Sequence, residues 1–187
     1  MEEFPIMNYD EDYFKNRIIE KKHYIQVIQW LNTLQKKMVI NDETKAYDYG
    51  CGRGPYVHTL NYFGINTSGY DISNNAINNP IGLANDKTST ILSKDEYSIV
   101  ICIDVLEHVQ RKEEEEVCNN IVRLVKQGGY LIMSICDITL KDVYKDSTHI
   151  NLKSREYWEY KFKSLGFELL PIIDWVFKNQ MYLLKKL

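Results

Sequence analysis

The chain has 187 residues, of which 44% are hydrophobic, 26% charged and 12% aromatic, with 9 Gly and 4 Pro. This length and composition predict one folded domain over residues 1–187 and exclude a mainly disordered or low-complexity chain. The formal charge of -3 provides no overall field that would hold a nucleic acid. The N-terminus is acidic and no apolar run approaches the roughly 18 residues of a membrane span, so we expect a cytoplasmic protein without a membrane partner.

The sequence offers no recognisable metal motif. Its cysteines, at positions 51, 102, 118 and 136, form no C-x-x-C pair and have no histidine at zinc-ligand spacing. The acids at 137, 142 and 146 match no loop of known ligand geometry, and Glu113–Glu116 is typical of the solvated first turn of a helix. We therefore expect reduced, mostly buried thiols and no metal site.

A helix over Tyr13–Leu34 is predicted to open the fold, because apolar residues recur there at helical spacing without Pro or Gly. Those apolar residues are Phe14, Ile18, Ile25, Ile28 and Leu31. A short strand, Ala46–Tyr49, then leads through a glycine-rich turn into a second helix, Tyr56–Phe63. These elements form the first strand–turn–helix unit of the chain.

A strand over Thr67–Asp71 follows, and Ser73 is a candidate N-cap of a short helix that reaches about Asn79, before Pro80. The continuous apolar run Ile99–Ile103 is typical of a strand covered on both faces of a parallel sheet.

A helix over Lys112–Lys126 and a strand over Tyr130–Cys136 follow, separated by Gly128 and Gly129. Strands that alternate with helices at this spacing predict a doubly wound α/β sheet with its ligand site at the carboxyl ends of the strands.

The C-terminal part is predicted to contain a helix, Ser154–Leu165, and a pair of strands, Phe167–Ile173 and Met181–Leu184. The turn between those strands is expected at 178–180. Pro171 cannot donate a hydrogen bond to a neighbouring strand, so the first of the two is expected at an edge of the sheet.

The segment 48–54 reads DYGCGRG and stands between a predicted strand and a predicted helix. Glycines there allow a tight turn and a close approach of the backbone to a ligand. Asp71 ends the next strand, where a carboxylate can accept hydrogen bonds from ribose hydroxyls. The dinucleotide fingerprint G-x-G-x-x-G would need a glycine at the position of Pro55, so a nucleotide-binding oxidoreductase is disfavoured.

This glycine pattern resembles motif I of the class I S-adenosylmethionine-dependent methyltransferases, and three further segments agree in order and spacing. Residues 68–72 (SGYDI) are similar to the second motif, residues 102–109 (CIDVLEHV) to a segment of the small-molecule methyltransferases, and residues 127–131 (QGGYL) to the turn before the fifth strand. Residues 9–14 (YDEDYF) and 147–152 (STHINL) resemble, more weakly, segments of the sugar and small-metabolite branch.

The resemblance implies a Rossmann-like, doubly wound seven-stranded sheet, mostly parallel with an antiparallel last strand. It implies S-adenosyl-L-methionine as the cofactor, with S-adenosyl-L-homocysteine as the product. It also implies an N-terminal cap over residues 1–40 and a core over residues 45–187. Aromatic residues of the N-terminal segment belong either to the core or to a lid that closes over the site.

Carried over residue by residue, the resemblance places a first group around the methionine part of the cofactor, a second at the ribose, and a third at the sulfonium end and the substrate mouth. These groups are Asp48, Gly50, Cys51, Gly52 and Gly54; Asp71 and Ile72; and Asp104, Val105 and His108. The candidate substrate contacts are Glu107, Tyr9, Tyr13 and Phe14. No clear motif among residues 86–88 supplies an acid for the adenine.

Methyl transfer from a sulfonium requires that the acceptor be held in line and lose its proton. Histidine suits this second task because its pKa lies near neutral pH. His108 and His149 follow the fourth and fifth strands, whereas His23 and His58 fall on helices. We predict His149 as the base, with His108 as its support or as the base itself. His149 could instead cap the last helix, and Glu107 could merely begin the helix that follows it.

These observations predict an enzyme that transfers a methyl group from S-adenosylmethionine to an oxygen or nitrogen atom of a small molecule, with the end segments favouring a sugar or related metabolite. Two alternatives remain. An RNA or protein methyltransferase would be expected to show a basic face, or an N/D-P-P-Y/F segment where DVLE stands. A regulatory subunit that binds S-adenosylmethionine without catalysis would carry the same motifs.

Overall fold

The computed structural model describes residues 18–139, 146–176 and 180–187. The candidate substrate contacts Tyr9, Tyr13 and Phe14 lie outside the described residues, as do the segment 9–14 and most of the turn expected at 178–180. No helix of the described residues is long and apolar enough to cross a bilayer.

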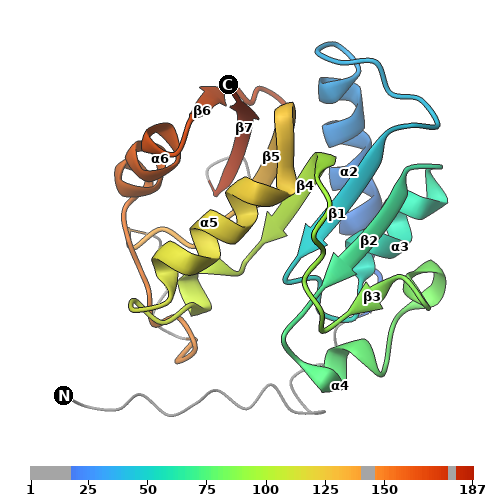
Figure 1. Ribbon diagram of the computed structural model, residues 1–187, viewed down its shortest axis with the longest axis horizontal. Coiled ribbons are helices and arrows are strands. Elements are labelled where there is room, and N and C mark those ends of the chain that lie inside the picture. The colour runs from blue at the N-terminus through green and yellow to red at the C-terminus, as the bar shows by residue number, and fades with distance from the viewer. Residues whose placement is uncertain (1–17, 140–145, 177–179) are drawn as a thin grey trace.

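A seven-stranded sheet in the order β3-β2-β1-β4-β5-β7-β6 forms the centre of the molecule (Figure 1). β7 runs antiparallel to both of its neighbours, and the other pairs are parallel, which confirms the predicted doubly wound sheet. The strands are β1 (Lys45–Tyr49), β2 (Asn66–Tyr70), β3 (Thr88–Ser89), β4 (Tyr97–Ile103), β5 (Val125–Ser134), β6 (Phe167–Leu170) and β7 (Met181–Lys186).

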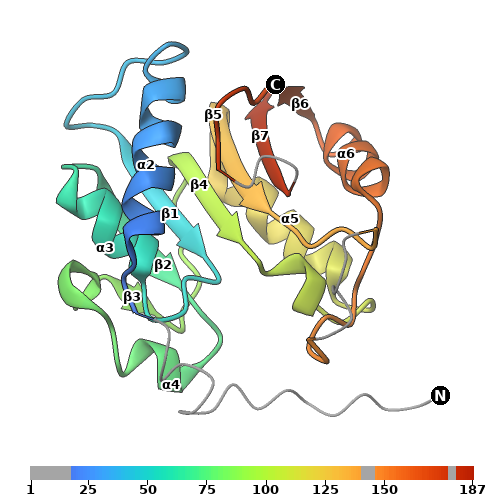
Figure 2. The same cartoon turned by 180° about the vertical axis from the view of Figure 1, so that it is seen from behind.

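Helices cover both faces of the sheet, and alternate residues of each central strand serve the two layers. In β4, Val100 and Cys102 face one cluster, which holds Trp158 and Phe162, whereas Ile99 and Ile101 face the other, which holds residues of α2 and α3. Figure 1 shows the first layer in front, and Figure 2 shows the second. The helices are α2 (Lys21–Leu34), α3 (Pro55–Tyr62), α4 (Asn74–Ile77), α5 (Glu114–Leu124) and α6 (Arg155–Ser164), with the 3-10 turns η1 (Gly82–Ala84) and η2 (Leu106–His108).

The first helix differs from its prediction in both its start and its buried face. α2 begins at Lys21, and residues 18–20 are not helical. Ile25 and Ile28 are exposed, while the buried face carries His23 and Gln26 together with three apolar side chains. Those apolar side chains are Val27, Trp30 and Leu34. The polar residues are buried because they meet Tyr56 of α3: Gln26 accepts a hydrogen bond from the tyrosine hydroxyl at 2.8 Å, and the ring of His23 packs edge-on against the tyrosine ring.

The junction of α5 and β5 was also predicted wrongly. α5 ends at Leu124 and β5 begins at Val125, so residues 125 and 126 are strand rather than helix. Gly128 and Gly129 lie inside β5, where the pairing jumps from Tyr97–Val125 to Ile99–Tyr130. This wide bulge places two glycines in a strand, because Gly128 has the left-handed backbone that glycine tolerates.

The C-terminal elements follow the prediction with one shortening. Ser154 caps α6 by accepting a hydrogen bond from the amide of Tyr157. β6 ends at Leu170 instead of Ile173, since Pro171 cannot extend the ladder. β6 lies at the edge of the sheet and pairs with β7 as a hairpin, as predicted.

We expect Tyr56→Phe to destabilise the protein by about 1–3 kcal/mol, because it leaves the buried side-chain oxygen of Gln26 without its donor. Tyr62→Phe, on the exposed side of the same helix, is the matched control and should change the free energy of unfolding by less than about 0.5 kcal/mol. Urea unfolding of the two variants measures both values. Equal effects would show that the contact between Gln26 and Tyr56 does not hold α2 in place.

Candidate active site at the carboxyl ends of the strands

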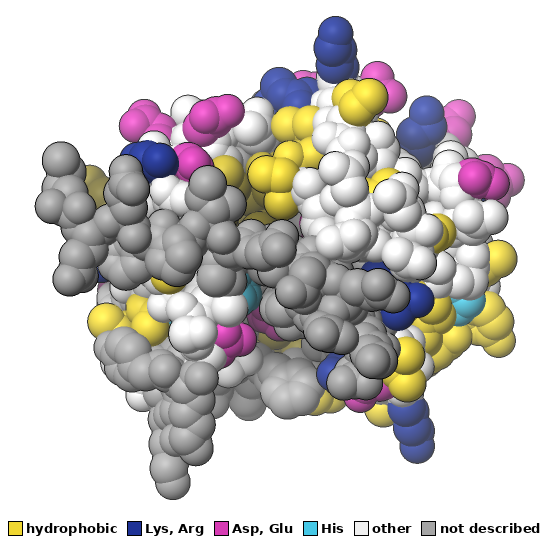
Figure 3. Space-filling model, turned by 90° about the horizontal axis from the view of Figure 1, so that it is seen from below, with side chains coloured by type: hydrophobic (Ala, Val, Ile, Leu, Met, Phe, Trp, Pro, Cys, Tyr) yellow, Lys and Arg dark blue, Asp and Glu magenta, His cyan; other side chains and the backbone are white. Residues whose placement is uncertain are grey.

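The predicted site residues gather at the edge of the sheet where β1, β2, β4 and β5 end. Figure 3 looks onto this edge of the molecule, and acidic and histidine side chains are visible between the atoms drawn in grey. Two groups of residues can be distinguished there. One surrounds the turn after β1, and the other surrounds η2, which follows β4.

The turn after β1 requires glycine at two positions. Gly50 has φ +76°, and a Cβ at this position would lie 2.4 Å from a methyl carbon of Val105. Gly54 has φ +80°, and its Cβ would lie 2.5 Å from that of Ala84. The left-handed backbone and the close neighbours both exclude larger side chains. The turn therefore presents bare backbone at the end of β1.

Asp71 fastens this turn to the end of β2. Its carboxylate oxygens accept hydrogen bonds from the amide of Gly52 at 2.7 Å and from the amide of Ser73 at 2.8 Å. Ile72, beside it, is 74% exposed. The acid predicted at the ribose is thus held in a fixed orientation, with an exposed apolar side chain next to it.

Asp48 is a buried carboxylate beneath the same turn. It is 2% exposed, and within the described part of the chain its Oδ2 atom has no hydrogen-bond donor. Burial, and then the nearby charge of Asp71, raise its pKa to about 8. An orphaned acceptor under a glycine turn fits a ligand that brings a hydrogen-bond donor or a positive charge, such as the aminoacyl end of S-adenosylmethionine.

Cys51 belongs to the turn without being reactive. It is buried, and burial raises the pKa of its thiol well above the usual value. A thiol of this kind is a poor nucleophile, so its contribution is packing.

Asp104 and Val105 connect the two groups of site residues. Asp104 follows β4 with φ +53°, which is uncommon for a residue other than glycine, and its carboxylate is hydrogen-bonded to the hydroxyl of Ser134 in β5. Val105 packs against the position of Gly50. Two positions further along, Glu107 begins the second group.

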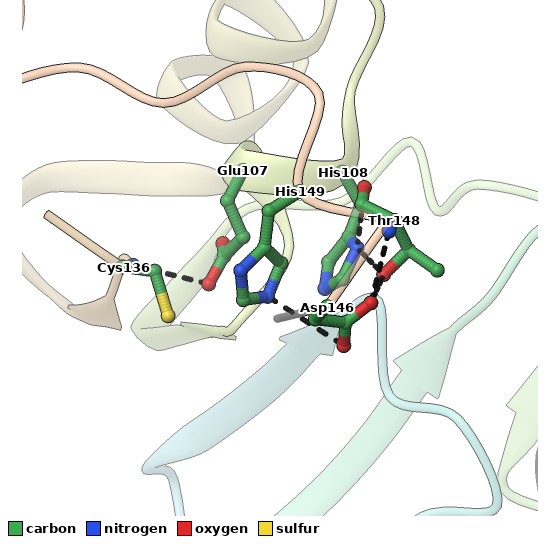
Figure 4. A network of polar contacts seen from close by, with 6 residues as sticks. All are labelled: Glu107, His108, Cys136, Asp146, Thr148 and His149. Atoms are coloured by element: carbon green, nitrogen blue, oxygen red, sulfur yellow. Dashed lines mark hydrogen bonds and ion pairs between the residues drawn. The ribbon is translucent and has the colours of Figure 1, made fainter. Parts of the chain in front are cut away.

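The second group consists of Glu107, His108 and His149 (Figure 4). The amides of Ile150 and Asn151 both donate to the backbone carbonyl of Glu107 at 2.9 Å, and this contact brings the segment of His149 alongside η2. The imidazole centroids of His108 and His149 are 4.9 Å apart. Suitable donor atoms of all three side chains lie within 4.8 Å of one another.

Neighbouring groups hold each member of this cluster. Nδ1 of His108 is hydrogen-bonded to the hydroxyl and the carbonyl oxygen of Thr148, at 2.9 and 3.1 Å. Nε2 of His149 lies 3.8 Å from a carboxylate oxygen of Asp146. Glu107 is fully buried and accepts a hydrogen bond from the amide of Cys136 at 3.1 Å.

The electrostatics favour neutral side chains in this cluster when no ligand is bound. Burial, and then the adjacent His149, lower the pKa of His108. Burial, and then the charge of Asp104, raise the pKa of Glu107. The cluster therefore contains a neutral imidazole that can accept a proton at neutral pH.

The structure brings together the described residues predicted for the cofactor and for catalysis, and it places Glu107 underneath His149 rather than on the surface. His23 and His58 lie on α2 and α3, where His58 is bound by the amide of Leu83. The sequence analysis missed Thr148 and Ser134. The only signal for Thr148 was its place beside His149, after an aspartate that could form an Asx turn.

Comparisons with known proteins agree with this geometry. Residues 21–172 match a family model described as "Methyltransferase domain". Ubiquinone biosynthesis O-methyltransferases from two strains of Rickettsia bellii are 30% identical over 132 residues, which cover 64% of this chain and 54% of each relative. The chain thus spans about half the length of these curated relatives.

Solved structures share the fold. A methyltransferase from Clostridium acetobutylicum described as S-adenosylmethionine-dependent has a TM-score of 0.67 at 12% identity, covering 95% of this chain and 96% of that chain. Magnesium protoporphyrin IX methyltransferase from Synechocystis, solved with bound SAH, has a TM-score of 0.65 at 18% identity, covering 92% and 87%. At these identities the likeness concerns the fold alone.

The raised pKa of Asp48 predicts a pH-dependent stability. Between the unfolded value of 3.8 and the folded value of about 8, the folded protein binds a proton that the unfolded chain has lost. Stability from this group is therefore complete below pH 3.8 and falls by up to about 1.4 kcal/mol per pH unit as the pH rises to 8. We expect Asp48→Asn to remove this slope.

Urea unfolding of the cofactor-free protein at several pH values between 5 and 8 tests this prediction. Effects of other groups cancel in the difference between the wild type and Asp48→Asn, and Asp42→Asn, on the surface, controls for the change in net charge. Parallel pH curves for the wild type and Asp48→Asn would contradict the prediction.

Gly54→Ala should destabilise the protein more than Gly64→Ala, although both glycines have φ close to +80°. The backbone strain costs each variant about 1–2 kcal/mol, but only the alanine at 54 collides with Ala84, which adds about 1–3 kcal/mol. Chemical unfolding compares the two variants directly. A loss of the same size in both would mean that the turn can shift to admit a side chain.

Proposed function

The chain belongs to the class I S-adenosylmethionine-dependent methyltransferase family, and on this basis we propose that it is an enzyme that transfers a methyl group from S-adenosylmethionine to an oxygen atom of a small molecule. The observation that carries the proposal is the meeting of two devices at adjacent strand ends. The glycine turn with the orphaned carboxylate of Asp48 lies after β1, and the Glu107–His108–His149 cluster lies after β4.

The first device supplies the cofactor contacts. The turn at Gly50–Gly54 leaves room for the methionine part, where Oδ2 of Asp48 can accept a hydrogen bond from the ligand. Asp71 and the exposed Ile72 lie where the ribose is expected. When bound, S-adenosylmethionine supplies an already activated methyl group, so the protein has only to hold the acceptor in line and to remove its proton.

The second device manages that proton. His149 is the residue that we assign to accept it, because it lies on the ligand side of the sheet and is partly exposed, with a carboxylate of Asp146 beside it to stabilise the imidazolium. His108 supports the orientation of His149 through ring contact and is itself anchored by Thr148.

A small hydroxyl-bearing acceptor agrees with three observations. The curated relatives are described as O-methyltransferases of ubiquinone biosynthesis. The net charge of -3 offers no general attraction for RNA. The resemblance of residues 147–152 to the sugar and small-metabolite branch includes His149 itself. Among hydroxyl compounds, we favour a sugar or related metabolite.

Calorimetric titration with S-adenosylmethionine and S-adenosylhomocysteine, with NAD as the control ligand, tests the cofactor. We expect micromolar binding of both sulfur ligands and none of NAD. Asp71→Asn and Asp71→Ala should weaken binding in that order, because the alanine also releases the amides of Gly52 and Ser73. Absence of binding by the folded, ligand-free protein would contradict the proposal.

Turnover on a panel of sugars, phenols, amines and structured RNA tests the acceptor and the base. We expect activity on a hydroxyl compound, a loss of about 10²–10⁴-fold in kcat for His149→Ala, and unchanged cofactor affinity. His58→Ala, a histidine of α3 outside the site, is the matched control. Methylation of RNA alone would contradict the small-molecule acceptor, and cofactor binding without any turnover would support a regulatory subunit.

A further inference from the structure

We propose that Glu107, His108 and His149 form a binding site for a divalent transition-metal ion. Metal binding itself can be measured independently, but its role in catalysis rests on the proposed function, whose acceptor step it refines. The sequence analysis expected no metal site, because the histidines come from two segments that are far apart in the chain. The fold brings these segments together through the two amide bonds to the carbonyl oxygen of Glu107.

The strongest sign of a missing cation is the side chain of Glu107. It is fully buried, one of its oxygens accepts a hydrogen bond from Cys136, and the other, Oε2, has no partner within the described part of the chain. A buried carboxylate oxygen without a donor is costly. Figure 4 shows the carboxylate beside the imidazole of His149, so a cation placed between them would satisfy this oxygen.

The distances suit a common ligand after small side-chain movements. Donor atoms of the three residues lie within 4.8 Å of one another. Ligand atoms that are each about 2.0–2.2 Å from one ion can be at most about 4.4 Å apart. Small rotations of the imidazoles close this difference without a change in the backbone.

Neighbouring groups already orient the ligands. Thr148 engages Nδ1 of His108, so we assign Nε2 as the ligand atom of that residue. Asp146 lies beside His149, and the amide of Cys136 holds Glu107. Hydrogen bonds of this kind, which fix the orientation of metal ligands, are usual around protein metal sites.

The donor set indicates the kind of ion. Two imidazoles and one carboxylate suit Zn²⁺, Mn²⁺, Fe²⁺ or Co²⁺, whereas Mg²⁺ and Ca²⁺ prefer oxygen ligands throughout. Three protein ligands leave a position open for a further oxygen. A hydroxyl bound there would lose its proton to solvent more readily, because the cation stabilises the alkoxide. In this metal-bound form the imidazole of His149 is a ligand, and the cation replaces it in activating the acceptor.

The untagged full-length protein, freed of metal with a chelator, should be titrated with Co²⁺ and followed by its visible absorption. Zn²⁺ affinity should be measured by competition with a chromophoric chelator. We expect one equivalent of either ion to bind, and we expect Glu107→Gln and His149→Ala to weaken binding by at least about tenfold. His58→Ala should bind both ions as the wild type does. His149→Ala changes a partly exposed residue, so it tests the site even where Glu107→Gln fails to fold.

Failure to bind micromolar Co²⁺ and Zn²⁺, or binding that His149→Ala leaves unchanged, would overturn the proposal. These outcomes are distinct from failure of the proposed function. Metal binding without binding of S-adenosylmethionine would retain the metal site and contradict the enzyme. Full turnover in the presence of a chelator, by protein shown to be free of metal, would retain the enzyme and overturn the role of the ion in catalysis.

Discussion

The architecture of the site depends on the close approach of the chain after β1 to the chain after β4. A methyl group of Val105 occupies the space where a Cβ of residue 50 would lie, so the two strand ends can pack only if residue 50 is glycine. This contact places the glycine turn beside Asp104 and Val105. Because η2 follows immediately, it also sets the distance between the turn and the Glu107–His108–His149 cluster.

Carboxylates accumulate at this edge of the sheet. Asp48 and Glu107 are buried, and each has one oxygen without a donor in the described part of the chain. Asp71 and Asp104 lie next to them and raise their pKa values further. An edge of this kind is unfavourable for the empty protein, but it favours ligands that bring positive charge or hydrogen-bond donors. The sulfonium and ammonium groups of S-adenosylmethionine are such ligands, and a divalent cation is another. The same electrostatic feature thus accounts for both proposed ligands.

Errors in the predicted helices and strands fall where tertiary contacts outweigh local pattern. In α2, isoleucines at helical spacing predicted one face, but the neighbouring Tyr56 selected another that includes Gln26. At Val125, a helical pattern continued into residues that the sheet recruited as a strand. In both places the free energy of packing against a specific neighbour exceeds the small differences in propensity between alternatives.

The sequence by itself determined the doubly wound sheet, the glycine turn and the acid after β2, because each depends on residues close together in the chain and on strand alternation that any parallel sheet requires. Only the tertiary structure decided which side chains share the acceptor side of the site. His149 reaches Glu107 through backbone hydrogen bonds between distant segments, and Thr148 reaches His108 in the same way. No spacing rule encodes such contacts, since they depend on how a loop after β5 folds back over η2.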